Sequence, residues 1–270
     1  MPHVLLLTMP IPYYHVDSFT AGLFAGNPAG VCIMSAYPAD EVMQKIAAEN
    51  RHSQTAFVVG RGEREFDLRW FTPEVEDDLC GHATLAAAHV LALRGQEVWP
   101  VHFHTRSGLL SVLRDGDLYE MDFPIWPAKA CEAPPALLLG LGILSAEVSK
   151  SRDYLVVLDS VDQVRDLSPD FTVLGRLDIG IGGVIVTAPG AGTVDYVARF
   201  FAPSVGIPED PVTGSIQCTL AHYWTTRLGN RTFHVRQLSA RGGELRCRME
   251  GDRVKVAGQA RLYMHGLIEL

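Results

Sequence analysis

The sequence predicts an α+β protein of two similar lobes, each a mostly antiparallel sheet wrapped around one central helix, with a cleft between the lobes. An internal duplication is the main reason. Residues 79–89 and 212–222, aligned on Gly81 and Gly214, both pass from small or polar residues into a mostly apolar helical segment with a His at the same offset. Because the copies lie about half a chain apart, they indicate a duplicated domain rather than a solenoid, whose repeats span roughly 20–50 residues.

Length and composition agree with two lobes. The chain has 270 residues, of which 47% are hydrophobic and 20% charged, and domains commonly run to about 100–150 residues. Prolines spread over residues 124–135 mark the crossing between the halves. We therefore expect an N-terminal lobe over residues 1–120 and a C-terminal lobe over residues 128–258.

Strands and two helices are predicted in order along the first half. Apolar residues recur at the helical period over residues 39–50, with acidic residues in the favourable first turn, and Gly95 stops the helix that follows Gly81. Residues 115–117, Asp-Gly-Asp, are a hairpin signal. Strands are predicted at residues 13–19, 31–34, 55–60, 65–71, 98–104, 108–113 and 118–123.

The second half repeats this composition. A long, largely apolar helix is predicted over residues 216–228 and is typical of a helix buried between sheets. Shorter helices are expected at residues 134–144 and 161–167. Strands are predicted at residues 151–159, 183–188, 194–201, 232–238, 244–249 and 253–257.

Each copy of the repeat is a loop that leads into a helix N-terminus. A glycine lets the backbone turn and approach a ligand, and the first helical N–H groups have no partner within the helix. If the halves face each other, the two N-termini converge on one cleft, which would favour a small carboxylate and any negative charge that develops on it. The alternative is that Thr213 and Ser215 merely cap a helix and the glycines merely turn the chain.

Several residues of the two copies could do chemistry. His82 is the natural acid–base candidate, and Asp210 could orient it or take a proton itself; the alternative for Asp210 is a capping acid. Both are expected on a solvated cleft, where replacement would leave the fold intact. Cys80 and Ser215 are possible nucleophiles or hydrogen-bond donors. The counterpart of Cys80 is Thr213, so a two-thiol proton shuttle is unsupported.

Composition also excludes several partners. The net charge of −8 argues against nucleic acid and anionic membranes, which need clustered Lys and Arg. No stretch approaches the roughly 20 apolar residues of a membrane span. The short apolar run at residues 4–9 lacks a preceding basic residue, so we expect no targeting signal and a cytoplasmic protein. Five cysteines without regular spacing suggest reduced thiols and no metal site.

Four motifs resemble the phenazine-biosynthesis PhzF-like isomerases, which share the diaminopimelate epimerase fold. They are Gly26-Asn27-Pro28, the segment 50–57, Phe-Thr-Pro at 71–73 followed by Gly81-His82, and the segment 209–215. The resemblance covers essentially the whole chain. It implies a site between the lobes, no cofactor, a homodimer, and a final strand at residues 260–270 that returns to the first lobe. The site positions that it implies are Asn27, Ser53, Gly81, His82, Asp210, Gly214 and Ser215, to which we add Cys80 and Thr213 as substrate-binding candidates.

Gln54 departs from this pattern. The resemblance implies a glutamate after Ser53 that moves a proton on the substrate, but an amide has no useful titration near neutral pH and cannot act as a general base. Either His82 and Asp210 carry the proton chemistry, with Gln54 and Ser215 on the walls of the site, or the pocket performs a different reaction.

Three functions therefore remain open. The first is a cofactor-independent isomerase or epimerase of a small carboxylate in a biosynthetic pathway, with an enol-like anion held by the helix ends. The second is a carbon–carbon bond hydrolase or lyase acting on a natural-product intermediate in the same pocket. The third is a non-catalytic protein that binds a small carboxylate.

Overall fold

The computed structural model describes residues 10–180 and 182–270. The first half of the chain forms β1 (Ile11–Ser18), β2 (Asn27–Met34), α1 (Asp40–Asn50), β3 (Gln54–Gly60), β4 (Glu65–Phe71), β5 (Glu76–Asp77), α2 (Gly81–Leu93), β6 (Val101–Thr105), β7 (Gly108–Asp115) and β8 (Leu118–Pro124). The second forms β9 (Lys129–Ala130), α3 (Pro135–Leu141), β10 (Glu147–Lys150), β11 (Tyr154–Val157), α4 (Val161–Arg165), α5 (Phe171–Leu174), β12 (Val184–Pro189), β13 (Tyr196–Phe201), the 3₁₀ helix η1 (Pro203–Val205), α6 (Gln217–Leu228), β14 (Thr232–Gln237), β15 (Gly243–Glu250), β16 (Arg253–Gly258) and β17 (Ala260–Ile268).

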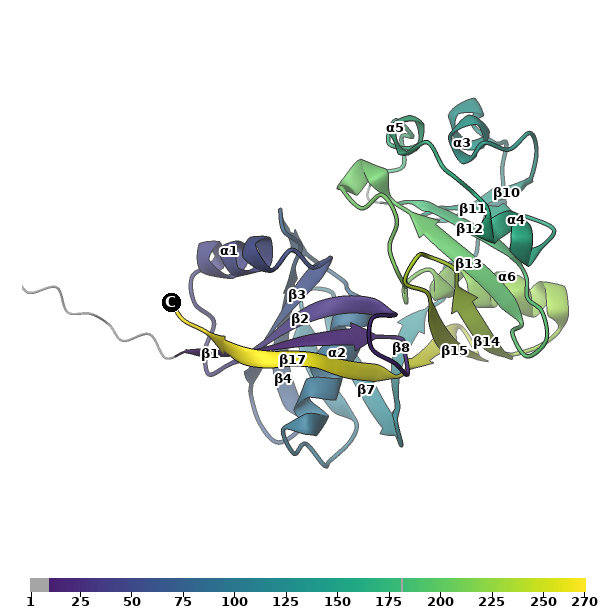
Figure 1. Ribbon diagram of the computed structural model, residues 1–270. Coiled ribbons are helices and arrows are strands. Elements are labelled where there is room, and N and C mark those ends of the chain that lie inside the picture. Colours follow the sequence, from purple (N-terminus) through teal and green to yellow (C-terminus); the bar gives the residue numbers. More distant parts are fainter. Residues whose placement is uncertain (1–9, 181) are drawn as a thin grey trace, which may run out of the picture.

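The predicted α+β fold of two lobes is confirmed (Figure 1). In the first lobe the sheet surrounds α2, which is buried on nearly every side because it is built largely of alanine and branched apolar residues. In the second lobe α6 takes the equivalent place and contacts β15 and β16. The apolar character of both helices is therefore explained by contact with strands all round rather than on one face.

The duplication extends to the path of the chain. In the first lobe the parallel pairs β2–β3 and β4–β6 flank α1 and α2. In the second lobe the parallel pairs β11–β12 and β13–β14 flank the α4–α5 segment and α6. The remaining ladders of both lobes are antiparallel. Corresponding helices therefore occupy corresponding crossovers, as expected of two copies of one unit.

Strand pairing and the path of the chain both join the lobes. The strand β8 pairs with β16 in an antiparallel ladder, so that hydrogen bonding runs through all 17 strands of the described chain. The strand β17 returns to the first lobe and pairs with β1, as the resemblance implied. The expectation of a separate sheet in each lobe is therefore wrong, because the pairing of β8 with β16 joins the two sheets into one. The expected boundaries at residues 120, 128 and 258 stay predictions, and the first nine residues, including the apolar run 4–9, lie outside the described part of the chain.

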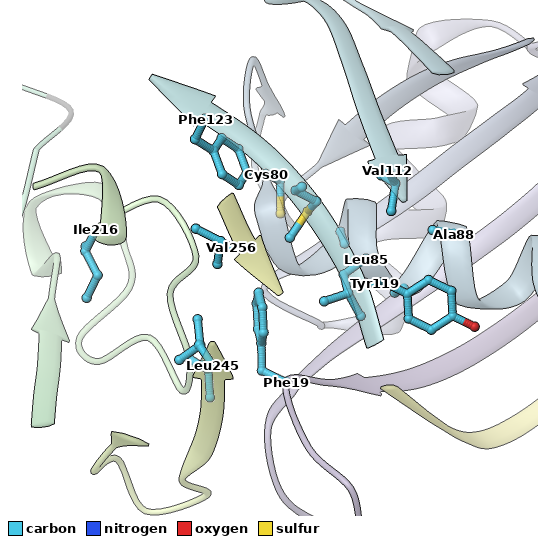
Figure 2. Close-up of a cluster of buried hydrophobic side chains, with 14 of the residues drawn as sticks. Phe19, Cys80, Leu85, Ala88, Val112, Tyr119, Phe123, Ile216, Leu245 and Val256 are labelled. Carbon is cyan, nitrogen blue, oxygen red and sulfur yellow. The ribbon is translucent and has the colours of Figure 1, made fainter. Parts of the chain in front are cut away.

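The largest apolar cluster also crosses between the lobes. Figure 2 shows Phe19, from the loop after β1, lying among Leu85 of α2 and the second-lobe residues Leu245 and Val256. All four side chains are almost completely buried. Burial of a large apolar side chain contributes about 1.5–3 kcal/mol, so this shared cluster holds the two lobes together directly behind the glycine motifs.

Candidate active site at the junction of the lobes

The two glycine motifs meet at the junction of the lobes. A Cβ atom added to Gly81 would lie 3.7 Å from the Cα of Gly214, and one added to Gly214 would lie 3.9 Å from the Cα of Gly81. The expectation that the two motifs converge is therefore met. Any larger side chain at either position would fill the space between the lobes.

The two helix starts differ in detail. The helix α2 begins at Gly81 itself, but α6 begins at Gln217. The backbone N–H of Gln217 donates to the carbonyl of Gly214 at 3.1 Å. Neither helix has a side-chain cap. The alternative in which Thr213 and Ser215 cap a helix is therefore wrong, because Thr213 donates to Asp210 and the Ser215 hydroxyl makes no hydrogen bond in the described chain.

Asp210 is the most strongly held carboxyl group of the site. Its Oδ1 accepts a hydrogen bond of 2.7 Å from Asn27 of the first lobe, and its Oδ2 accepts one of 2.5 Å from Thr213. Burial raises the pKa of Asp210 to about 6, although these two donors favour its ionised form. A carboxyl group with such a pKa can hold a proton, and also release it, close to neutral pH.

Gln237 supports this arrangement and was missed in the sequence. Its amide nitrogen donates to the carbonyl of Asp210 at 2.8 Å and to Thr213 Oγ1 at 3.1 Å, and its Oε1 accepts from the N–H of Thr213 at 2.9 Å. The side chain is almost fully buried. A glutamine near the end of a strand carries no motif, so only its contacts reveal that it positions the 210–213 segment.

His82 lies on the opposite side of the junction and is only 5% exposed. Burial, and to a smaller extent the charge of His52, lower the pKa of the His82 imidazole to about 3, so the ring is neutral near pH 7. Asp210 is likewise only 8% exposed. The expectation that both residues lie on a solvated cleft is therefore wrong, because both side chains are buried. No hydrogen bond joins the two side chains within the described residues.

Cys80 sets the orientation of the His82 ring. The sulfur lies 3.5 Å from Nδ1 of His82, and burial, together with the charge of Asp77, raises the pKa of the Cys80 thiol well above its usual value. A protonated thiol can donate to Nδ1, which leaves the ring hydrogen on Nε2. That Nε2 is buried and has no partner in the described chain, and in this tautomer it is a hydrogen-bond donor.

Gln54 reaches a carboxylate that the sequence analysis did not select. Its Nε2 donates to Oδ2 of Asp77 at 3.0 Å, and Oδ1 of Asp77 accepts from the N–H of Leu79 at 3.3 Å. Burial raises the pKa of Asp77, although both donors oppose this. The Gln54 side chain is 7% exposed, and its Oε1 is buried without a partner. Asp77 belongs to the acidic run before Gly81, but a run of three acids does not reveal which one faces the site.

Three buried polar atoms around the junction have no hydrogen-bond partner in the described chain. They are Oδ1 of Asn27, Oε1 of Gln54 and Nε2 of His82. Buried polar atoms are normally paired, because leaving one unsatisfied costs about 1–3 kcal/mol. A bound molecule or ordered water would have to supply their partners. Ser53 and Ser215 are half-buried, and their hydroxyls make no hydrogen bond within the described residues.

A separate cavity of about 320 Å³ is lined by residues of both lobes, including Thr20, Arg241 and Arg246. None of the site residues predicted from the sequence lines it. The guanidinium of Arg241 is already bound to Asp17 at 2.7 Å and to the carbonyl of Gly26 at 2.8 Å. The glycine junction, and not this cavity, is therefore the candidate active site.

No group of three or more His, Cys, Asp or Glu side chains in residues 10–180 and 182–270 is arranged to hold a metal ion. In the same ranges, no helix is long and apolar enough to cross a membrane. The expected independence from cofactors stays a prediction.

Comparison with known proteins assigns the family. A model described as phenazine biosynthesis-like protein (PhzC-PhzF) matches residues 16–266. An uncharacterized isomerase of Pseudomonas aeruginosa is 49% identical over 263 residues, which cover 97% of this chain and 100% of the relative. A PhzF-family crystal structure from Enterococcus faecalis aligns with a TM-score of 0.92 and 43% identity over 97% of this chain and 100% of that one.

A hydroxyproline epimerase from Agrobacterium vitis, solved with bound trans-4-OH-L-proline, has the same fold at only 12% identity, with a TM-score of 0.63 over 97% of this chain and 93% of that one. The predicted epimerase-like fold is thereby confirmed. Together with the glycine motifs that face each other at the junction, these matches establish that the chain belongs to the phenazine biosynthesis-like (PhzC-PhzF) family.

Proposed function

We propose that this protein is a cofactor-independent isomerase or epimerase that moves a proton on a small carboxylate bound between the lobes. The observation that carries the proposal is the state of Asp210. It is a buried carboxyl group with a pKa raised to about 6, held by Asn27 from one lobe and Thr213 from the other, beside two facing glycine motifs.

The surroundings suit an enolate-like intermediate. Removal of a proton next to a carboxylate leaves an anion, which hydrogen-bond donors and positive electrostatic potential stabilise. The N-terminus of α2 supplies such potential at Gly81. A neutral His82 supplies an Nε2–H donor, which stabilises an oxyanion without itself becoming charged. In this proposal His82 stabilises charge and Asp210 delivers the proton.

The names of the relatives support the same reaction class. The Pseudomonas aeruginosa relative is called an isomerase, and the distant epimerase with the same fold holds a small cyclic carboxylate. The latter shares only the fold, so hydroxyproline is a probe for this chain and not an assigned substrate.

Solvent deuterium tests the proposal. The purified protein is incubated in D2O with the common 2-amino acids, trans-4-hydroxy-L-proline and a set of 3-enoic acids, and each mixture is followed by proton NMR and mass spectrometry. We expect one acid to form an isomer that carries deuterium at the new C–H bond. Asp210→Asn should slow isomer formation by about 100- to 10,000-fold, whereas the exposed control Asp159→Asn should not.

Other outcomes would contradict this function. Release of a smaller acid fragment would indicate carbon–carbon cleavage. Binding of an acid without isomer formation or exchange would indicate a non-catalytic binding protein. Equal isomer formation by wild type and Asp210→Asn would remove the observation on which the proposal rests.

We also propose that the protein is a homodimer joined through β17. Within the described chain this strand pairs with β1 alone, and it exposes Tyr263, Met264 and Leu267. Exposed apolar residues on an unpaired strand edge are typical of an interface. Sedimentation should give twice the chain mass for the wild type and the single mass for Leu267→Glu, and a monomeric wild type would contradict the proposal.

A further inference from the structure

We infer that Asp77 is a second catalytic carboxylate of this site, that Gln54 presents it, and that Asp77 removes the proton which Asp210 replaces. This inference rests on the proposed function. It adds a residue that neither the duplication nor the motif resemblance selects, and it gives Gln54 the task of positioning a base instead of acting as one.

Both carboxylate oxygens of Asp77 are hydrogen-bonded. Asp77 ends the two-residue strand β5, and four residues later Gly81 begins α2. Its two oxygens are held separately, Oδ2 by the Gln54 amide at 3.0 Å and Oδ1 by the Leu79 N–H at 3.3 Å. Each oxygen keeps a lone pair for another partner. Gln54 therefore fixes the carboxylate while leaving it able to accept a proton.

The Gln54 amide uses only part of its hydrogen-bonding capacity within the described chain. Its nitrogen is used by Asp77, but its Oε1 is buried and unpaired in the described chain, and the side chain is 7% exposed. A molecule that donates to Oε1 would bind the same amide group whose nitrogen holds the Asp77 carboxylate. Binding at Gln54 and proton removal by Asp77 are thus linked through a single side chain.

The carboxyl groups of Asp77 and Asp210 interact electrostatically. Burial is the main cause of the raised pKa of Asp210, and the charges of Glu209 and Asp77 add to it. Burial likewise raises the pKa of the Cys80 thiol, and the charges of Asp77 and Asp210 add to it. A negative charge on one of these carboxyl groups therefore favours the protonated form of the other. This is the state that proton removal by one group and delivery by another requires.

The proposed reaction removes one proton from the substrate and returns one to it. The Asp77 carboxylate accepts the proton of a C–H bond next to the substrate's carboxylate or double bond, and the electron pair of that bond moves into the conjugated system. The protonated Asp210 then gives its proton to a carbon of the resulting anion. The substrate loses one proton and gains one, and exchange with water returns both acids to their starting states.

The alternative is that Asp77 only anchors the loop before α2 through the Leu79 N–H. The variants Asp77→Asn and Asp78→Asn separate the two roles, because Asp78 is the exposed neighbouring carboxylate and serves as the matched control. A third variant, Gln54→Glu with Asp77→Asn, exchanges the two groups, so that an amide at 77 can donate to a carboxylate at 54. Benzoate, a planar carboxylate, is the probe for binding.

If Asp77 is catalytic, Asp77→Asn slows both substrate deuteration and isomer formation by about 100- to 10,000-fold while benzoate binding and Tm stay close to the wild type. Asp78→Asn keeps full activity, and the exchanged double variant recovers at least about tenfold over Asp77→Asn. Asp210→Asn gives a different signature: it still deuterates the substrate but forms little isomer. If Asp77→Asn does not fold, Asp77→Glu separates the two roles, since it keeps the charge and moves it by one methylene. The rate of isomer formation should fall at least about tenfold in Asp77→Glu if Asp77 is catalytic, and it should not fall if Asp77 only anchors the loop.

Asp77→Asn with wild-type exchange, or Asp77→Glu with wild-type rates, would overturn the inference and leave the proposed function intact. Absence of exchange in the wild type would overturn the proposed function and this inference with it.

Discussion

The amide nitrogen of Asn27 lies 2.7 Å from Oδ1 of Asp210, and these residues are separated by 183 positions in the sequence. The same nitrogen donates to the carbonyl of Val212 at 2.9 Å. Asn27 begins β2 of the first lobe, whereas Asp210 precedes α6 of the second. The carboxyl group best suited to proton transfer is therefore held in place by the opposite lobe, and its ionisation depends on the closed junction.

Asn27→Ala should raise the pKa of Asp210. The variant removes a hydrogen bond that favours the ionised form, while the burial that favours the neutral form remains. The pH at which the rate of isomer formation falls, which we assign to ionisation of Asp210, should rise by about one unit. The measurement is the pH dependence of isomer formation. Thr213→Val removes the other side-chain donor and should move the limb in the same direction. An unchanged limb in both variants would show that Asp210 does not cause it.

In the wild type, kcat/KM should fall as the pH rises through about 6. The reason is that Asp210 must be protonated to deliver its proton, and its pKa is about 6 in the free protein. A bound carboxylate disfavours a second negative charge, so the corresponding limb of kcat should lie at higher pH. In Asp210→Asn this limb should disappear together with most of the activity. A rate that rises through pH 6 would contradict the role given to Asp210.

His82→Gln should retain more activity than His82→Leu. The Gln amide nitrogen can occupy the place of Nε2 and donate to an oxyanion, whereas Leu has no donor. Loss of one such donor typically costs about 100- to 1,000-fold in kcat. Equal activity of the two variants, measured on the same acid, would show that Nε2 does not stabilise the reacting anion.

Gln54→Glu should weaken binding of carboxylates and lower activity. It places a second carboxyl group about 3 Å from Asp77, where Gln54 now donates at 3.0 Å, and two like charges so close cannot both ionise without cost. The comparison is benzoate affinity and isomer formation in the single variant and the wild type. A large gain in activity would mean that the wild type is an isomerase that lacks its base, and that Asp77 does not supply it.

Acid should destabilise the protein through its buried histidines. Burial lowers the pKa of His82 from its ordinary 6.5 to about 3, and those of His52 and His89 to about 4. Between these values the unfolded chain binds more protons, so the free energy of unfolding falls as the pH drops below 6.5. Asp210 acts in the opposite sense between pH 3.8 and about 6, and so does Asp77, whose pKa burial also raises. The three histidines outnumber these two acids. Urea unfolding at pH 7 and 4.5 should show the loss, and His82→Gln should show a smaller one.

Much of the fold could be predicted because its signals are local. The helix α2 follows an apolar run stopped by Gly95, and the structure ends it at Leu93. The short strands β5, β9 and β10 and the small helix α5 were missed, because two to four residues carry no periodicity. The ladder between β8 and β16 was missed as well, since pairing between lobes depends on register and not on the pattern of either strand.

The site was predictable where it repeats and not where it depends on distant contacts. Gly81 and Gly214 were found from their matched surroundings, and their contact follows from the duplication. The roles of Asp77 and Gln237 come from hydrogen bonds to residues 23 positions away at Gln54 and 24 positions away at Thr213. The burial of His82 depends on how the surrounding elements pack, which a single motif does not encode.

Deuterium content of the product after one turnover in D2O tests the central claim most directly. If Asp210 delivers a proton to the anion held between the lobes, the first isomer formed carries one solvent deuterium at the new C–H bond, and Asp210→Asn forms little of it. An isomer that forms without deuterium at the same rate in wild type and Asp210→Asn would contradict the account.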